Sequence, residues 1–203
     1  MKKNNNALIL IFGIIISLLS YIFDSSVKLF FNGLKIPLFD SILSIITNFG
    51  VVIVVMLVIP TIIISKNDTK SQENRGFSRS RKFRKFSPEI KLLWLAFLSA
   101  VVLSFIIKLI FLRQRPYEAI SYPMLNILNF SFPSMHSLVV FALLPLLSRF
   151  LPKQKYFWVI FAFMVAFTRI YFGFHFLSDV VFGAFSGYFT GILILELNDK
   201  GKI

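Results

Sequence analysis

Six apolar stretches separated by polar segments constrain the fold of this chain more than any other feature of its sequence. The stretches lie at about 7–23, 42–64, 91–111, 135–151, 156–174 and 177–197. Most of them approach the roughly 20 residues that an α-helix needs to cross the core of a bilayer. A helix also satisfies its backbone hydrogen bonds within one segment, which lipid demands. The sequence therefore predicts an all-α integral membrane protein, built as a bundle of six transmembrane helices.

The composition agrees with this prediction. Of the 203 residues, 57% are hydrophobic and 15% are charged, whereas a soluble domain has about 45–50% apolar and about 25% charged residues. A soluble protein with unusually many buried helices fits these values less well. The chain has no cysteine, which excludes disulfides, zinc–thiolate sites and cysteine nucleophiles. No repeat or second domain is evident, so we expect residues 1–203 to form a single domain.

The distribution of charge predicts the orientation in the membrane. The segment 65–91 contains nine Lys or Arg and three acidic residues, which is typical of a cytoplasmic loop. With that loop inside, alternation of six spans places both termini in the cytoplasm. Sixteen of the 22 basic residues then lie inside, so the net charge of +13 reflects topology and indicates no nucleic acid. The basic residues left unexplained are Lys28, Lys35, Lys108, Arg113, Arg115 and Arg169.

Three segments leave alternatives open. The first apolar stretch resembles a signal peptide, but it is long and no cleavage site follows, so we expect a retained helix. The motif SRSRKFRKF at 78–86 fits either a plain cytoplasmic loop or a contact with anionic lipid. The segment 24–41 is expected to be the first outer loop. Its apolar side chains either border the route of a lipid tail or pack as ordinary re-entrant structure.

Two clusters of polar residues lie on the outer side of this topology. In KLIFLRQRP, Lys108 and Arg115 are seven residues apart, so they share a face if the helix continues that far; alternatively, both snorkel at the interface. In FPSMHS, Ser134 is a candidate N-cap and His136 falls in the first turn of the next helix. A helix N-terminus suits a phosphate, although the same pattern fits a capping serine beside an interfacial histidine.

A third cluster, RIYFGFHFLSD, lies on the same side and brings together three ionisable residues. His175 and Asp179 are four residues apart, so on a helix they share a face and the carboxylate can orient the imidazole. That leaves the other ring nitrogen available as a nucleophile or a base. Arg169 precedes His175 by six residues, across Gly173, where the chain can turn. The alternative is a structural Asp–His pair in a turn.

Taken together, the three clusters indicate phosphoryl chemistry. Three cations and a helix N-terminus bind an anion with several oxygens and stabilise the charge of a phosphoryl-transfer transition state. One oriented histidine can attack phosphorus, and the second can protonate the leaving oxygen. Water would then hydrolyse the covalent phosphohistidine. The cations supply the positive charge, so we expect no metal and no other cofactor.

The three motifs, in this order, resemble the signature of the type 2 phosphatidic acid phosphatase (PAP2) family. KLIFLRQRP is similar to its K-x6-R-P motif, FPSMHS to its P-S-x-H motif, and RIYFGFHFLSD to its R-x5-H-x3-D motif. They lie within residues 108–179. The sequence departs from the family at Met135, where glycine is frequent, and at Thr168, where serine is common.

The resemblance implies a role for each residue of the candidate site. His175 would be the nucleophile, Asp179 its orienting partner and His136 the general acid. The residues that would hold the phosphate are Lys108, Arg115, Arg169 and Ser134, with nearby backbone N–H groups. The implied activity is that of a metal-independent phosphatase of the lipid branch. Its catalytic residues would face the outer side of the cell membrane.

The resemblance also bounds the substrate and the partners. Undecaprenyl-type polyprenyl diphosphate comes first as the substrate, followed by phosphatidic acid and phosphatidylglycerol phosphate. The bilayer is the other expected partner, and the sequence leaves the oligomeric state open. Two other classes remain as alternatives. A two-His-one-carboxylate metal enzyme would suffer repulsion between the cations and its metal, and an anion or lipid transporter would place charge at mid-membrane.

Overall fold

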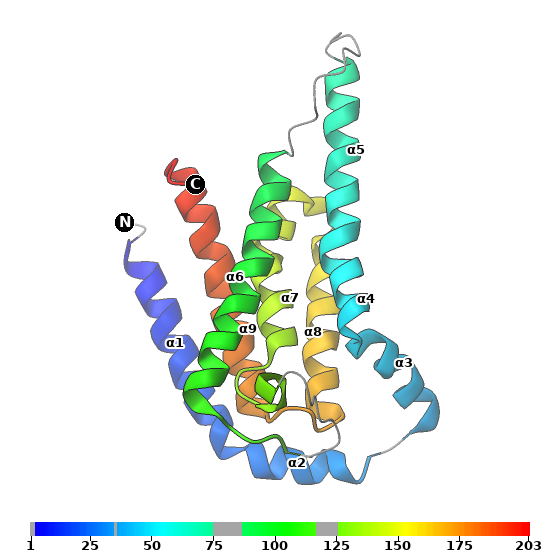
Figure 1. Cartoon of the computed structure of the whole chain (residues 1–203), viewed down its shortest axis with the longest axis vertical. Coiled ribbons are helices and arrows are strands. Elements are labelled where there is room, and N and C mark those ends of the chain that lie inside the picture. Colours follow the sequence, from blue (N-terminus) through cyan, green and yellow to red (C-terminus); the bar gives the residue numbers. More distant parts are fainter. Residues whose placement is uncertain (1–2, 35, 75–86, 117–125) are drawn as a thin grey trace.

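The computed structural model describes residues 3–34, 36–74, 87–116 and 126–203. Over these residues the regular structure is helical, with no β-strand. Figure 1 shows the long helices side by side in one bundle. Both termini, the end of α5 and the start of α6 lie at one end, here named the terminal end. Helix α2 and the loops after α6 and α8 lie at the other end, here named the α2 end.

The described residues form nine α-helices, five of which follow predicted apolar stretches closely. They are α1 (Lys3–Ile22), α2 (Asp24–Asn32), α3 (Pro37–Thr47), α4 (Phe49–Ile53), α5 (Ile59–Asn74), α6 (Pro88–Phe111), α7 (Met135–Phe150), α8 (Lys155–Tyr171) and α9 (Leu177–Asp199). A π-helical turn, Val54–Val58, joins α4 to α5. The 3₁₀ turns Asn126–Asn129 and Pro152–Gln154 precede α7 and α8.

Fewer than six of these helices are long and apolar enough, by themselves, to cross a membrane. Among the described residues, three qualify: Phe49–Thr69, Pro88–Phe111 and Leu177–Asp199. A fourth is added if Ile11–Ile22 and Asp24–Asn32, which meet at a bend of 55°, form one broken span. Helices α7 and α8 have 16 and 17 residues, somewhat fewer than the roughly 20 that a spanning helix needs. The structure thus supports an all-α membrane protein and leaves six spans as a proposal.

The second predicted stretch, 42–64, has different boundaries in the structure. Asn48 divides it, because its side chain accepts hydrogen bonds from the N–H groups of Gly50 and Val51 (2.9 and 3.4 Å) and so starts a new helix. The helix then continues to Asn74, well into the segment 65–91 that was expected to be a loop. The basic motif SRSRKFRKF lies outside the described residues.

Helix α7 forms the centre of the bundle. Its residues from Ser137 to Leu144 are all buried, and it packs against α6, α8 and α9. A helix that is apolar on all sides is expected in such a position. Helix α9 approaches it most closely along Gly183, Gly187 and Gly191. A Cβ atom at Gly187 would lie 2.2 Å from the carbonyl oxygen of Leu138, so the contact between the two helices requires glycine.

The segment expected to be the first outer loop is helical instead. Helix α2 runs across the α2 end of the bundle, and α3 follows it towards the start of α4 (Figure 1). The two helices and the residues between them expose large apolar side chains: Leu29, Phe30, Leu34, Ile36, Leu38, Phe39, Ile42 and Ile45. Such helices suit the interface between lipid and water. The segment thus forms a helical cover over the end of the bundle where the candidate residues meet.

Candidate active site

His175 lies in the short connection between α8 and α9, at the α2 end. Helix α8 ends at Tyr171, and Gly173 has a φ of 67° that reverses the chain. The backbone N–H of His175 donates to the carbonyl of Arg169 (3.1 Å). Helix α9 begins only at Leu177. His175 and Asp179 therefore do not share a helical face as predicted, because the histidine precedes the helix, yet the turn still brings them together.

Asp179 is fully buried in the first turn of α9. One carboxylate oxygen, Oδ2, accepts from the backbone N–H of Phe176 (2.8 Å) and from the hydroxyl of Ser131. Nδ1 of His175 lies 3.7 Å from the same Oδ2 atom and 3.5 Å from the Ser131 hydroxyl. The hydroxyl thus bridges the imidazole and the carboxylate, which are too far apart for a direct hydrogen bond. Nδ1 of His175 faces Ser131 and Asp179, so Nε2 is the ring nitrogen that remains available to react with a substrate.

Ser134 and His136 lie at the start of α7, as the sequence predicts. Ser134 is the N-cap, and its hydroxyl accepts from Ser137, while its own N–H donates to the carbonyl of Asp179 (3.1 Å). That last bond ties α7 to α9. The ring of His136 packs edge-on against Phe49, with 4.8 Å between ring centroids. His136 also lies within electrostatic range of His175 and Arg169.

The helix that carries Lys108 ends earlier than the motif suggested. Leu112 adopts a left-handed conformation (φ 46°) and terminates α6, so Arg115 lies in the extended segment beyond it. The two cations therefore do not share a helical face, although both reach the same loops. The ammonium group of Lys108 donates to the carbonyl of Phe130. The guanidinium of Arg115 donates to the carbonyl of Phe174 (3.0 Å), the residue before His175.

The third predicted cation, Arg169, lies in the last turn of α8 and is buried. Its Nη1 donates to the hydroxyl of Thr47 (2.6 Å), at the end of α3. Its guanidinium carbon lies 4.5 Å from the centre of the Phe174 ring, a favourable cation–π distance. Thr168, one of the departures from the family motif, also donates its hydroxyl towards Thr47 (2.9 Å).

The pKa of His175 is lowered well below its usual value of 6.5. The first cause is burial, since 3% of the residue is exposed. The second is positive charge from, in decreasing order of effect, Arg169, Arg115 and Lys108. Both factors disfavour the imidazolium ion. His175 is therefore neutral at physiological pH, which is the form that a nucleophile requires.

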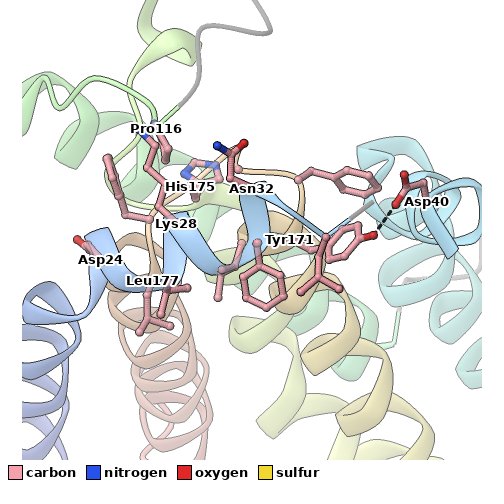
Figure 2. A pocket seen from close by; sticks show the side chains of 15 residues that line it. Asp24, Lys28, Asn32, Asp40, Pro116, Tyr171, His175 and Leu177 are labelled. Carbon is pink, nitrogen blue, oxygen red and sulfur yellow. Dashed lines mark hydrogen bonds between the residues drawn. The ribbon is translucent and has the colours of Figure 1, made fainter. Parts of the chain in front are cut away.

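A cavity of about 280 Å³ opens onto His175 beneath α2. Figure 2 shows His175 among residues of three regions: Asp24, Lys28 and Asn32 from α2, Pro116 after α6, and Leu177 at the start of α9. At the far side, the hydroxyl of Tyr171 donates to Asp40 (2.5 Å), which joins α8 to α3. Of the seven predicted residues, His175 lines this cavity. The other six are not among its lining residues, and four of them are buried in the protein: Lys108, Ser134, Arg169 and Asp179.

Sequence reasoning missed four residues of the site. Arg113 and Ser131 both contact Asp179, Asp24 binds Arg113, and Thr47 binds Arg169. Arg113 carried a signal, because it is a basic residue that membrane topology does not explain. Asp24 and Ser131 carried no such signal, because a single aspartate or serine near an apolar segment is also common as a helix cap or a surface residue.

Comparison with known proteins identifies the family. The sequence model of the PAP2 superfamily matches residues 89–202, which is more than half of the chain. The chain belongs to the PAP2 superfamily. The matched segment contains α6 to α9 and all seven predicted site residues. No curated protein sequence matches the chain significantly.

Solved structures of two PAP2-type proteins share the fold. The transmembrane PAP2-type phosphatidylglycerolphosphate phosphatase from Bacillus subtilis is 20% identical, with a TM-score of 0.71 over 98% of both chains. LpxE from Aquifex aeolicus is 24% identical, with a TM-score of 0.57 over 85% of this chain and 94% of LpxE. The first likeness includes α1 to α5, which the family match does not reach. The protein thus has both the family and the fold of PAP2 phosphatases.

Proposed function

We propose that this PAP2 protein is a metal-independent membrane lipid phosphatase that works through a phosphohistidine on His175. The observation that carries the proposal is the convergence of predicted residues at the α2 end. A neutral histidine, a second histidine, a buried carboxylate and three cations meet there from four separate segments. Burying so many charged groups is costly, and a structural role alone gives no reason to gather them beside a histidine that lines an open cavity.

We place the α2 end on the outer side of the cell membrane, with six spans and both termini in the cytoplasm. Figure 1 supports this arrangement, because the termini, the end of α5 and the start of α6 lie together at the opposite end. The lysines and arginines near those elements satisfy the positive-inside rule. Helices α2 and α3 then lie along the outer surface of the bilayer.

In the first chemical step, Nε2 of His175 attacks the phosphorus atom of the bound phosphate. The Nδ1 atom keeps its proton, which points to the pair formed by Ser131 and Asp179 (3.5 and 3.7 Å). Positive charge that develops on the ring is stabilised by the Asp179 carboxylate. The bond from phosphorus to the leaving oxygen breaks, which is the ester oxygen of a phosphomonoester or the bridging oxygen of a diphosphate, and His136 donates a proton to that oxygen.

In the second step, water attacks the phosphohistidine and releases inorganic phosphate. His136, now deprotonated, accepts a proton from the water, and His175 leaves as a neutral imidazole. Lys108, Arg115 and Arg169 stabilise the charge on the phosphoryl oxygens in both steps. The carbonyl and hydroxyl groups that they contact hold these cations in one orientation before substrate arrives.

We propose a polyprenyl diphosphate or a glycerol-based phosphatidyl phosphate as the substrate class. The outer location of the site favours a lipid carrier such as undecaprenyl diphosphate. The likeness to the Bacillus subtilis protein, whose described substrate is phosphatidylglycerolphosphate, supports the second class. Lipid tails would lie along the exposed apolar surface of α2 and α3. A transporter fits less well, because the charged residues gather at one end of the bundle.

Phosphate release tests the proposal. The protein in detergent with EDTA is given a polyprenyl diphosphate, phosphatidic acid and phosphatidylglycerol phosphate in parallel. Release by the wild type in EDTA and its loss in His175→Ala would support the mechanism, and the ratio of rates identifies the preferred lipid. Release that EDTA abolishes would overturn the metal-independent mechanism.

A further inference from the structure

Arg113 lies between two buried carboxylates that come from distant parts of the chain. Its Nη1 donates to Oδ1 of Asp179 (2.6 Å), and its Nη2 donates to Oδ2 of Asp24 (2.7 Å). Asp24 is the first residue of α2 and Asp179 is in the first turn of α9. The exposed fractions of these two carboxylate side chains are 6% and 0%. One guanidinium thus joins the corner between α1 and α2 to the proposed partner of the nucleophile.

Ser178 closes this cluster. Its backbone N–H and its hydroxyl both donate to Asp24 (2.8 and 2.6 Å), and its oxygen accepts from Arg113 (2.8 Å). The guanidinium also lies over the ring of Phe176, 4.1 Å from its centre. Ser178 and Phe176 flank Leu177, where α9 begins. The cluster therefore fixes the first turn of α9, which carries Asp179, against α2.

Two arginines that are two residues apart in RQRP have different partners. Arg115 donates to the backbone carbonyls of Leu128, Asn129 and Phe174. Arg113 binds two carboxylates, which neutralise its charge and occupy both terminal nitrogens. Three of its five N–H donors are used in this cluster, and its positive charge is already compensated. Arg113 is thus suited to holding Asp179 in place rather than to binding substrate.

We propose that Asp24 and Arg113 are positioning residues for the phosphatase reaction. They fix the carboxylate of Asp179 so that it and Ser131 hold Nδ1 of His175, which directs Nε2 at the phosphate. The inference rests on the proposed function of the same site. It also extends that site beyond the matched residues 89–202, because Asp24 belongs to the N-terminal part of the chain.

The test compares full-length variants purified in the same detergent. Asp24→Asn keeps the shape of the side chain and removes its charge, and Arg113→Lys keeps the charge and loses the two-sided contact. The matched control is Arg149→Gln, which breaks an arginine–aspartate pair with Asp199 at the terminal end. For each variant, kcat, KM, the inhibition constant of inorganic phosphate and the unfolding temperature are measured.

We expect Asp24→Asn to lower kcat by about tenfold to a hundredfold, the loss that follows removal of the partner that orients a histidine in metal sites. KM and the inhibition constant of phosphate should stay within about twofold, because the phosphate-binding cations keep their own contacts. Arg113→Lys should retain more activity than Arg113→Gln. The double variant Asp24→Asn/Arg113→Gln should be no slower than the slower single variant, since both remove the same linkage.

Several results would overturn the inference. A kcat for Asp24→Asn within twofold of the wild type would do so, as would an equal loss in Arg149→Gln. A weaker affinity for inorganic phosphate that accounts for the loss would assign Asp24 and Arg113 to binding instead. If Asp24→Asn does not fold, Ser178→Ala, which removes a single hydroxyl from the cluster, is judged by the same criteria.

The outcome also separates this inference from the proposed function. An active wild type, an inactive His175→Ala and a fully active Asp24→Asn would overturn the positioning role alone. A folded wild type that releases no phosphate from any of the three lipids would overturn the proposed function, and the positioning role with it.

Discussion

The two ends of the bundle treat charge in opposite ways, although α7 and α9 run through both. At the terminal end, Arg149 of α7 pairs with Asp199 of α9 at 2.8 Å, with side chains 48% and 49% exposed. At the α2 end, Asp179 of the same helix α9 is fully buried and meets groups from several segments. Exposed pairs contribute about 0–1 kcal/mol to stability, whereas each buried ion costs several kcal/mol to desolvate.

This difference teaches where the function lies. The scaffold is shared, yet in the described part of the chain the buried ionisable side chains lie at the α2 end: Asp24, Lys108, Arg169, His175 and Asp179. The helices themselves therefore do not require buried charge. The buried charged groups at the α2 end therefore carry a desolvation free energy that the fold alone does not require. A reaction that develops charge on a phosphoryl group explains that cost, because pre-placed cations in a buried site act strongly on it. The predictions below test the contrast, in decreasing order of expected effect.

The largest effect is expected at His175, at the centre of the α2 end. His175→Ala should lower phosphate release by at least about 10³-fold, since removal of a nucleophile leaves only the binding and electrostatic contributions. The unfolding temperature should change little. Single-turnover release measures the effect. Residual activity within tenfold of the wild type would contradict the assignment of His175 as nucleophile.

The second histidine should show a loss that depends on the substrate. His136→Ala should lower release from a lipid substrate by about 10²–10⁴-fold, the usual contribution of a general acid. An activated aryl phosphate has a leaving group that needs no proton, so the same variant should hydrolyse it with a much smaller loss. His175→Ala should fail with both substrates. Equal losses of His136→Ala on both would argue against the general-acid role.

The helix contact shared by both ends can be broken directly. A Cβ atom at Gly187 would lie 2.2 Å from a backbone carbonyl of α7, whereas a Cβ at Gly33 meets no atom within 4 Å. Gly187→Ala should destabilise the protein by about 1–3 kcal/mol, as overpacking usually does, and should lower kcat as well. Gly33→Ala should be neutral. Thermal unfolding of both variants in detergent compares them, and an unchanged unfolding temperature for Gly187→Ala would refute the close contact.

The lowered pKa of His175 predicts the pH profile. Because the folded protein keeps the imidazole neutral to well below pH 6.5, kcat/KM should stay level as the pH falls through 6.5 and decline only at lower pH. In the unfolded chain the imidazole takes up a proton near pH 6.5, whereas in the folded protein it does not. The free energy of unfolding should therefore decrease as the pH falls below about 6.5. Arg169→Gln removes the positive charge with the largest effect on the pKa of His175, so the acid limb should move to higher pH. An acid limb at or above pH 6.5 in the wild type would contradict the buried, neutral histidine.

The smallest effect is expected at the terminal end. Arg149→Gln should change stability by less than about 1 kcal/mol, as for other exposed pairs, and should leave kcat unchanged. Unfolding temperature and phosphate release measure both. A tenfold loss of activity in this variant would remove the contrast between the two ends.

The sequence predicts the helices and the convergence of the site well, because both depend on local patterns. Apolar runs mark where helices cross the bundle, and three short motifs mark where their ends meet. Hydropathy fails where a helix becomes polar, which is why α5 extends to Asn74 beyond its predicted end. Asparagine is a frequent N-cap residue, so Asn48 could have indicated the start of a new helix. It lies inside an apolar stretch that was predicted as one span.

The partners of individual residues were harder to predict, because they depend on tertiary structure. Leu112 adopts a left-handed conformation that glycine favours. Because this residue is a leucine, the sequence did not predict that α6 ends before Arg115. Arg113 and Arg115 are two residues apart, and only the fold shows that Arg113 binds two carboxylates. Asp24 lies more than 80 residues before Arg113, a separation that no local pattern bridges.

Trapping the covalent intermediate tests the central claim most directly. The protein in EDTA is mixed with lipid substrate labelled with ³²P in the transferred phosphate, quenched in alkali, digested and analysed by mass spectrometry. The account predicts a base-stable, acid-labile phosphoryl group on His175 that forms and decays at rates compatible with turnover, and none in His175→Ala. Phosphate release without any label on His175, or with the label on another residue, would contradict it.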